Sequence, residues 1–343
     1  MNQRRMPAEW ERHAATWIAW PHNAEDWPGK FMAIPWVYAE IIRNLSRHEP
    51  VELLVQDAAA EVKVRRVLER ANALGENVRF HHCPTDRIWM RDSGCSFVKE
   101  AGALKAVKWC FNAWAKYPNW QRDEQVGCHM ATHTGAQELR PRIGDRRVVL
   151  EGGSIDVNGC GTLITTEECL LSDVQQRNPG LAKADYERIF AEYLGIQQVI
   201  WLDRGVEGDD THGHVDDITR FVAPDVIATV VEPNPADPNH EPLAENLRRL
   251  KAARTLSGKP FTLVELPMPS PVIFEGRRLP ASYGNFYIAN GVVLVPVFND
   301  PKDRVALDIL AKLFPDREVV GIYSGDFIWG FGAMHCMTQQ QPA

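Results

Sequence analysis

One cysteine, one histidine and three acidic residues stand in short motifs that lie far apart in the 343-residue chain. They are Asp92 in WMRDSG, Glu151 in LEGGS, His214 and Asp216 in THGHVDD, and Cys336 in MHCMTQQ. A thiolate is a strong nucleophile, and a histidine within hydrogen-bond reach can protonate a leaving group and then activate water. These residue types together predict a hydrolase that forms a covalent bond through cysteine.

The carboxylates narrow the class of substrate. Thiol enzymes that transfer acyl groups stabilise a developing oxyanion with N–H donors, and nearby negative charge opposes that transition state. A guanidinium, in contrast, is a planar cation that stays protonated at neutral pH and presents paired N–H donors to carboxylates. We therefore expect Asp92, Glu151 and Asp216 to surround a guanidine that Cys336 attacks.

Helical periodicity predicts five helices that would position these residues. Their expected ranges are 57–74, 122–133, 182–194, 242–256 and 301–314. The residues that end them are Gly75, Gly135, Gly195, Gly258 and Pro315, which are 60, 60, 63 and 57 residues apart. A period this regular indicates five repeats of one unit, whereas chain length alone suggests two or three domains.

Strands complete each predicted unit. β-Rich runs follow most helices at 78–82, 197–202, 261–266 and 318–323. In the second repeat, the strand is expected at 148–150. Hairpins are expected at 153–165 and 285–297, which turn at Asn158-Gly159 and Asn290-Gly291. Five such units about a pseudo-fivefold axis predict an α/β fold, a five-bladed α/β propeller, with residues 1–343 as a single catalytic domain. The alternative is an ordinary doubly wound α/β sheet with accidental regularity.

The candidate residues recur at nearly the same point of four repeats. Asp92 is 17 residues after Gly75, Glu151 is 16 after Gly135, His214 and Asp216 are 19 and 21 after Gly195, and Cys336 is 21 after Pro315. Functional sites are usually built from loops at strand ends on a rigid scaffold. The repeats therefore predict that these side chains converge at one end of the central axis.

Composition argues against several other classes of protein. Apolar residues make up 45% and charged residues 24%, as in an ordinary globular protein. With 38 basic and 45 acidic side chains, a net charge of -7 and no basic block, nucleic-acid binding is disfavoured. The longest apolar run, 287–298, is shorter than the roughly 20 residues of a membrane helix.

The chain termini and cysteines bear on its compartment. The N-terminal sequence MNQRRMPAEWERH has no apolar core typical of a secretory signal. The seven cysteines contain no CxxC pair, and an odd number cannot all be bridged. We therefore expect free thiols in a reducing, cytoplasmic compartment.

Six motifs in a fixed order carry a family resemblance. They are MPAEWERHAATWIAWP, WMRDSG, LEGGSIDVNGCGTLITTEECLL, DDTHGHVDD, RLPASYGNFYIANG and HCMTQQQPA, and they span nearly the whole chain. On these motifs the sequence resembles the agmatine deiminases and their relatives in the Porphyromonas-type peptidylarginine deiminase family, which belongs to the pentein superfamily. The fold implied by the resemblance is the five-bladed α/β propeller, or pentein fold.

The resemblance also implies a role for each candidate. Cys336 would attack the guanidinium carbon, and His214 would protonate the departing ammonia and then activate water to hydrolyse the S-alkylthiouronium. Asp92 and Asp216 would hold the guanidinium nitrogens, with Glu151 holding His214 or a substrate nitrogen. No cofactor or metal is required. Relatives commonly form dimers or larger assemblies, so the resemblance leaves open whether this chain forms a homo-oligomer.

The implied reaction is hydrolysis of agmatine to N-carbamoylputrescine and ammonia, a step of putrescine and polyamine biosynthesis. Trp89 is expected to pack against the substrate's apolar stem or its cation. Asp210 and, more weakly, Glu25 are expected to bind the far amine. Free or peptidyl arginine stays an alternative substrate, because a substrate carboxylate needs a cation and arginines lie near the motifs at 87, 91, 204 and 220.

The segment before the cysteine departs from the family pattern. Agmatine deiminases typically read GGNIHC there, whereas this chain reads FGAMHC. Phe331 thus replaces a glycine and Ala333 an asparagine, which could reshape the pocket or remove a hydrogen bond. His335 is not the expected partner of Cys336, because adjacent side chains on a strand point to opposite faces.

Two other classes of function fit part of the same pattern. His212, His214 and Asp216 alternate along the chain as metal ligands on a strand would, which is typical of a metal-dependent hydrolase. A non-enzymatic cation-binding protein would use the acidic residues alone and would need neither Cys336 nor His214.

Overall fold

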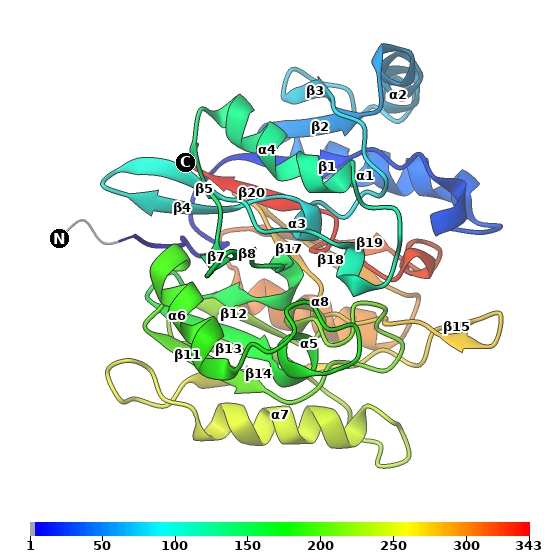
Figure 1. Cartoon of the computed structure of the whole chain (residues 1–343). Coiled ribbons are helices and arrows are strands. Elements are labelled where there is room, and N and C mark those ends of the chain that lie inside the picture. The colour runs from blue at the N-terminus through cyan, green and yellow to red at the C-terminus, as the bar shows by residue number, and fades with distance from the viewer. Residues whose placement is uncertain (1–3) are drawn as a thin grey trace.

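Five sheets of three or four strands carry the fold of the computed structural model, which describes residues 4–343 (Figure 1). Their strand orders are β20-β1-β2-β3, β4-β5-β6, β11-β10-β9, β12-β13-β14 and β17-β18-β19. The strands are β1 (His13–Ala19), β2 (Val51–Val55), β3 (Val78–His82), β4 (Ser96–Glu100), β5 (Ala103–Val107), β6 (Gln137–Leu139), β9 (Asp156–Val157), β10 (Thr162–Thr166), β11 (Gln198–Leu202), β12 (Thr219–Ala223), β13 (Val226–Val231), β14 (Thr262–Pro267), β17 (Tyr287–Ile288), β18 (Val292–Val297), β19 (Glu318–Tyr323) and β20 (Gln339–Pro342). Two separate hairpins pair β7 (Arg142–Ile143) with β8 (Arg146–Arg147) and β15 (Ile273–Phe274) with β16 (Arg277–Arg278).

Each of the five sheets contains the same chain path. An antiparallel pair of strands is followed by helix and then by a strand parallel to the second, as in β4, β5, α4 and β6. A parallel pair needs such a long crossover, because a tight turn cannot join its ends. The helices are α1 (Ile34–Leu45), α2 (Ala58–Arg70), α3 (Met90–Ser93), α4 (Asp123–Thr134), α5 (Glu167–Leu171), α6 (Lys183–Leu194), α7 (His240–Ala252) and α8 (Lys302–Leu313). The predicted α/β class is confirmed.

The first unit differs from the prediction, because it contains two crossovers. Helix α1 joins β1 to the parallel β2, and the predicted α2 makes a second crossover to β3. Helix α1 therefore matches α4, α6, α7 and α8 in its chain path, and α2 is an addition. The sequence pattern missed α1 because no glycine ends it; the residue that follows Leu45 is Ser46.

The ends of the other helices follow from their caps. The Asp57 side chain accepts a hydrogen bond from the Ala60 N–H and starts α2. Gly135 and Gly195 end α4 and α6 at φ values of 66° and 75°, which glycine adopts without a Cβ clash. Strands β3 and β19 have the predicted bounds, and α7 begins two residues earlier than expected, at His240.

The expected strand at 148–150 is wrong. The strand that follows α4 is β6, and Val149 makes only an isolated bridge with Cys110. The Val149 N–H is instead bound by the Asn178 side chain at 2.9 Å. β6 is short because Pro141, which lacks an N–H donor, follows it closely and the chain turns into the β7–β8 hairpin.

The C-terminal strand brings the two ends of the chain together. β20 pairs antiparallel with β1, with Gln340 opposite Thr16. The turn before β20 then contacts α3, where the Arg91 N–H donates to the Cys336 carbonyl at 3.1 Å. This pairing brings the last predicted site residue next to the first. Within residues 4–343, no helix combines the length and the apolar character needed to cross a membrane.

Candidate active site

All five sheets present a polar side chain directly before their first strand. Asp92 precedes β4, Glu151 precedes β9, Asp216 precedes β12 and Cys336 precedes β20, as the repeats predict. Asn285, which sequence reasoning missed, precedes β17 in the same way. The structure brings these five connections together around one site.

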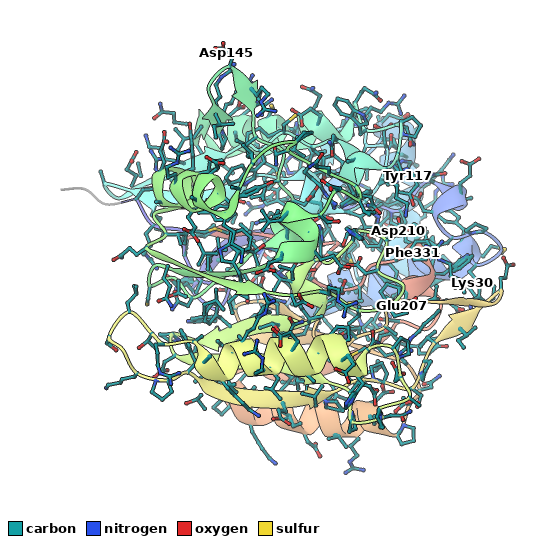
Figure 2. All side chains as sticks on the ribbon, turned by 60° about the horizontal axis from the view of Figure 1, so that its bottom comes forward. Lys30, Tyr117, Asp145, Glu207, Asp210 and Phe331 are labelled. Atoms are coloured by element: carbon teal, nitrogen blue, oxygen red, sulfur yellow. The ribbon has the colours of Figure 1, made fainter. Side chains whose placement is uncertain are left out.

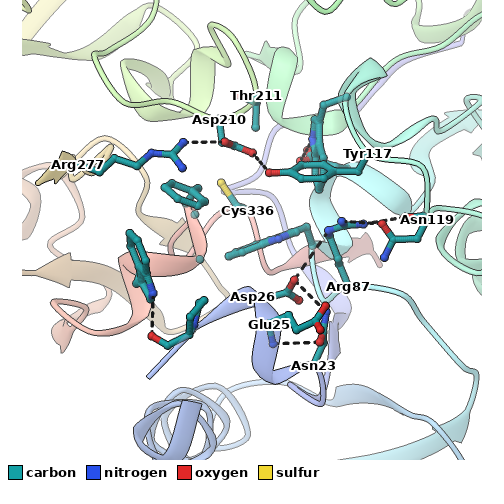
Figure 3. A pocket seen from close by; sticks show the side chains of 18 residues that line it. Asn23, Glu25, Asp26, Arg87, Tyr117, Asn119, Asp210, Thr211, Arg277 and Cys336 are labelled. Carbon is teal, nitrogen blue, oxygen red and sulfur yellow. Dashed lines mark hydrogen bonds and ion pairs between the residues drawn. The ribbon is translucent and has the colours of Figure 1, made fainter. Parts of the chain in front are cut away.

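A cavity of about 430 Å³ opens above this site (Figure 3). Of the five predicted catalytic residues, Asp92 and Cys336 line the cavity, whereas His214, Glu151 and Asp216 lie beneath its lining and are fully buried. The predicted substrate-binding residues Trp89, Asp210 and Glu25 also line it. The volume is typical of a pocket for a small molecule.

His214 lies at the centre of three carboxylates. Its Nε2 is 3.6 Å from Glu151 Oε2, and its Nδ1 is 3.9 Å from both Asp92 Oδ1 and Asp216 Oδ1. Within residues 4–343, both ring nitrogens, Glu151 Oε2 and Asp216 Oδ1 are buried without a hydrogen bond. Buried polar atoms are rarely left unpaired, so this convergent set is typical of a site that binds a further polar group.

Electrostatics separate the states of His214 and Glu151. Burial alone would lower the pKa of His214, but the charge of the Asp92 carboxylate, followed by the nearby Cys169 and Glu151, raises it well above its ordinary value. Burial would raise the pKa of Glu151, but Arg177, whose Nε lies 3.2 Å from Oε1, and His214 lower it to about 2. Glu151 is therefore a fixed negative charge beside a protonated imidazole.

Asp92 is held rigidly against the cavity. Its Oδ2 accepts from Trp114 Nε1 at 2.9 Å and its Oδ1 accepts from the Gly153 N–H at 3.1 Å. A Cβ at Gly153 would lie 2.5 Å from His214 Nδ1, so glycine permits the close approach. Burial, together with Asp216 and Glu151, raises the pKa of Asp92 to about 6 even though His214 opposes the shift.

Cys336 contacts a donor and a carboxylate. Its Sγ accepts from Asn285 Nδ2 at 3.0 Å and donates to Asp216 Oδ2 at 3.5 Å. Burial, followed by the charges of Asp216, Asp217 and Asp92, raises the pKa of this thiol well above its ordinary value. Cys336 is therefore a thiol when no cation occupies the site.

His335 points away from the cavity into a buried network. Its Nδ1 is 2.7 Å from Asp216 Oδ2 and its Nε2 is 2.8 Å from Glu9 Oε2. Arg220 Nη2 lies 2.9 Å from the other Glu9 oxygen. This network contacts Asp216 on the side away from the cavity. Burial opposes ionisation, but His335 lowers the pKa of Asp216.

The predicted far-end residues differ in their surroundings. Asp210 accepts from Lys116 Nζ at 2.7 Å, Tyr117 Oη at 2.6 Å and Arg277 Nη2 at 3.0 Å, so its charge is already paired (Figure 3). Glu25 is exposed. Figure 2 shows Tyr117, Asp210 and Phe331 grouped in one region of the molecule.

Asp26 is a carboxylate of this cavity that sequence reasoning missed. It lines the cavity, and its buried Oδ2 has no hydrogen-bond partner within residues 4–343. Arg87 Nε approaches Oδ1 only to 4.0 Å. Burial raises the pKa of Asp26 to about 6, against the charge of Arg87. The signal in the sequence was its place in NAEDWP, directly beside the chosen Glu25.

The alternative metal set of His212, His214 and Asp216 is not assembled. Among the described residues, His212 belongs to no group of close potential ligands, and its Nε2 contacts Ser172 Oγ at 3.1 Å. Potential ligands at the site instead form the groups Glu151, Cys169, His214 and Asp216, Asp217, Cys336. Each group contains two residues of the predicted thiol chemistry, together with Cys169 or Asp217, which were not predicted.

The sequence over residues 5–342 matches the Porphyromonas-type peptidyl-arginine deiminase family. The chain belongs to this family. The predicted family resemblance is thereby confirmed over almost the whole length.

Individual relatives in and around this family carry a more specific name. An agmatine deiminase of Pseudomonas aeruginosa (strain LESB58) is 37% identical, with 99% of this chain and 95% of the relative covered. Among solved structures, the agmatine deiminase of Enterococcus faecalis is 30% identical with a TM-score of 0.90, covering 99% of this chain and 96% of that one. The C. jejuni agmatine deiminase with substrate bound is 29% identical with a TM-score of 0.88, covering 100% and 97%.

The departure from the family motif has a structural consequence at Phe331. This residue has a φ of 67°, in the left-handed region where a non-glycine residue costs about 1–2 kcal/mol. Its ring lines the cavity and lies 4.0 Å from the Arg277 guanidinium. Ala333 is buried next to Gly332. The chain thus has an aromatic side chain at the cavity where the family pattern has none.

Asn285 was not predicted from the sequence for two reasons. It is uncharged, whereas the residues that mark the other repeats are titratable. It also lies 27 residues after Gly258, later than its counterparts, because the connection to β17 contains the β15–β16 hairpin. The signal that could have found it was the unfilled fifth repeat in SYGNFY.

Proposed function

We propose that this chain is an agmatine deiminase that hydrolyses agmatine to N-carbamoylputrescine and ammonia. The observation that carries the proposal is the buried cluster of Asp92, Glu151, Asp216, His214 and Cys336 at one cavity, in a chain whose relatives are named agmatine deiminases. The excess of carboxylates suits a cationic electrophile, and a guanidinium can bind several of them through paired N–H groups.

The carboxylates bind and orient the guanidinium. Asp92 and Asp216 hold its nitrogens, while Glu151 holds His214 beside the leaving nitrogen. The repulsion that raises the pKa of Asp92 to about 6 is offset when a cation enters. Binding therefore favours the ionised form of Asp92 and gives the site its preference for a cation.

The substrate also activates the nucleophile. The same negative charges that raise the pKa of Cys336 are neutralised by the guanidinium, so the thiol releases its proton to solvent more readily in the complex. Asn285 donates to Sγ and stabilises the thiolate that forms. The thiolate therefore forms mainly when the guanidinium that it attacks is bound.

The chemical steps use Cys336 and His214. The thiolate forms a C–S bond to the guanidinium carbon, and the tetrahedral adduct loses ammonia when protonated His214 gives its proton to the leaving nitrogen. An S-alkylthiouronium remains. Neutral His214 then takes a proton from water, whose oxygen attacks the same carbon. The C–S bond breaks, and the ureido product and the thiol are released.

Asp26 is the residue that we assign to the far ammonium of agmatine, in place of Asp210. Its carboxylate faces the cavity without a full partner, whereas Asp210 is already bound by Lys116 and Arg277. Trp89 packs along the apolar stem.

Free arginine is the second candidate substrate, because two cations also line the cavity. Arg87 and Arg277 are both part of its lining, and either can bind a substrate carboxylate. Arg277 is half-exposed and shares its charge with Asp210.

The test is to offer the purified chain agmatine, free arginine and an arginyl peptide and to measure ureido product and ammonia. We expect turnover of agmatine that a chelator leaves unchanged, that Cys336→Ala abolishes and that the matched Cys160→Ala, at an exposed cysteine, preserves. Turnover of either competitor without agmatine would refute the substrate. Full activity of Cys336→Ala would refute the mechanism.

Two further parts of the proposal concern the fold, which the repeated chain path supports, and the compartment, which the cysteines support. The five sheets are the blades of a five-bladed, pseudo-fivefold pentein propeller, and residues 1–343 form one catalytic domain. The described cysteines are free thiols, which is compatible with action in the cytoplasm in putrescine biosynthesis. Limited proteolysis that released a second, stably folded fragment, or small-angle scattering that showed two separate bodies, would contradict the single domain.

A further inference from the structure

A second cluster of potential ligands lies outside the active-site cavity, between two of the sheets. Glu52 of β2, His81 of β3 and His133 of α4 each present one ligand atom, and these atoms all lie within 4.8 Å of one another. None of the three lines the cavity at Cys336. Helix α4 belongs to the crossover of the next sheet, so the cluster joins the first unit to the second (Figure 1).

The contacts within this cluster are those of ligands that share a centre. His81 Nε2 is 2.7 Å from Glu52 Oε2, and His133 Nε2 is 4.0 Å from the same oxygen. The other Glu52 oxygen is bound by Arg79 Nη1 at 3.0 Å, which leaves Oε2 as a single ligand atom. The rings of His81 and His133 lie edge to face with centroids 4.2 Å apart.

A second observation points to a ligand at the same place. His129 lies one helical turn before His133, so both imidazoles occupy one face of α4. Within residues 4–343, its buried Nε2 has no hydrogen-bond partner, and its ring centroid is 5.5 Å from that of His81. Three imidazoles thus gather around one carboxylate, and one of them has an unpaired buried nitrogen.

We propose that Glu52, His81 and His133 form a binding site for a divalent metal ion that prefers imidazole ligands, with Zn²⁺ as the first candidate. Zn²⁺ binds nitrogen and oxygen at about 2.0–2.1 Å, so tetrahedral ligand atoms are about 3.3 Å apart. The observed 2.7 and 4.0 Å contacts bracket this separation, and the three ligand atoms all lie within 4.8 Å of one another. The fourth position is open to water or to His129.

The surroundings of the cluster favour a structural role and give the ion access. Trp17 packs beneath the histidines, with ring centroids 5.0 Å from His81 and 5.4 Å from His133. The His133 side chain is 44% exposed, which provides an entry path from solvent. A bound ion would fix α4 of the second unit to β2 and β3 of the first.

The test uses the full chain carrying Cys336→Ala, so that the active-site thiol does not contribute. Zn²⁺ binding is measured by calorimetry in this parent, in His133→Ala and in the matched control His82→Ala. His82 neighbours His81 on the same strand, but it is half-exposed and bonds Glu61. We expect one Zn²⁺ site in the parent and in the control, and at least a tenfold weaker site or its loss in His133→Ala.

Two further readouts make the result decisive. Co²⁺ bound at this site should give a tetrahedral visible spectrum without a thiolate charge-transfer band, since no cysteine is a ligand. Zn²⁺ should raise the thermal midpoint of the parent and of His82→Ala but not that of His133→Ala. Equal Zn²⁺ affinity and equal thermal shifts in all three proteins, or a sulfur-ligated Co²⁺ spectrum unchanged by His133→Ala, would overturn the proposal.

Discussion

Removing the Asn285 side chain should make Cys336 a poorer nucleophile while leaving the carboxylates in place. Asn285 Nδ2 donates to Sγ at 3.0 Å and to Asp217 Oδ1 at 2.9 Å, and Asn285 Oδ1 accepts from the His335 N–H at 3.0 Å. The substitution Asn285→Ala removes the only side-chain amide that contacts the sulfur among the described residues. Burial and three carboxylates already oppose the thiolate, which is favoured by a hydrogen bond from the Ala333 backbone and by this side-chain donor.

The expected size of the effect follows from the loss of one hydrogen bond to an ionised group. Such a bond contributes about 1.5–3 kcal/mol, which corresponds to a rise of about 1–2 units in the pKa of the thiol. Below that pKa the thiolate fraction falls about 10- to 100-fold. A more basic thiolate is also more nucleophilic, with a Brønsted slope of about 0.4–0.5, so the net loss in reaction rate is about 3- to 15-fold.

The assay is alkylation of Cys336 by iodoacetamide without substrate at pH 8, followed by mass spectrometry of its peptide. The matched control is Asn290→Ala, because the Asn290 side chain is also hydrogen-bonded, accepting from the His13 N–H at 2.8 Å and donating to the His13 carbonyl at 3.0 Å, but does not contact the thiol. Both variants should lose stability, and only Asn285→Ala should slow alkylation and kcat/KM for agmatine. Equal alkylation rates in the two variants would refute the reasoning.

Three further outcomes follow from the same site. Alkylation of Cys336 at pH 7 should accelerate when methylguanidine is added, since the cation offsets the charges that raise the thiol pKa. The prediction is contradicted if methylguanidine only slows alkylation at every concentration below saturation of the site. Asp26→Asn should lower the ratio of kcat/KM for agmatine to kcat/KM for butylguanidine about tenfold, which corresponds to the loss of one hydrogen bond to a charged group. In the parent, this ratio should also decrease as the pH falls below 6, because the pKa of Asp26 is about 6. In Asp26→Asn, the ratio should not change over that pH range. Arg177→Met should cost about 3–5 kcal/mol in denaturant unfolding at pH 7, because it leaves Glu151 buried and unpaired. Glu151 has its pKa lowered from 4.5 to about 2, so the Arg177→Met difference should shrink as pH falls through that range, while the exposed Arg188→Met costs under about 0.5 kcal/mol.

The parts of the fold that follow from local signals were predictable. The helix ends at Gly135 and Gly195 are set by left-handed backbone conformations that few residues adopt, and the hairpin turns at Asn290-Gly291 as predicted. Helix α1 lacks such a terminator, and its identity as the first crossover depends on the parallel pairing of β1 with β2. That pairing is a long-range contact that no local pattern reports.

The catalytic candidates were predictable from residue type and spacing because each lies directly before a strand of the repeated path. Their protonation was not. Cys336 carries a raised pKa and Glu151 a lowered one, although both are buried, because one faces carboxylates and the other faces Arg177. The difference arises from partners that are distant in the sequence, so it requires the structure.

The far end of the cavity shows why residue type alone does not identify a binding group. Asp210 and Asp26 are both carboxylates of the cavity lining, but Lys116 and Arg277, which are distant in sequence, pair with Asp210 only. A carboxylate that already binds two cations has little attraction left for a third, whereas one with an unpaired buried oxygen gains the full interaction. Selectivity for the far group is therefore controlled through the partners of each carboxylate. Replacing both Lys116 and Arg277 would free the charge of Asp210 for an ammonium without any change in the residues that contact the guanidinium.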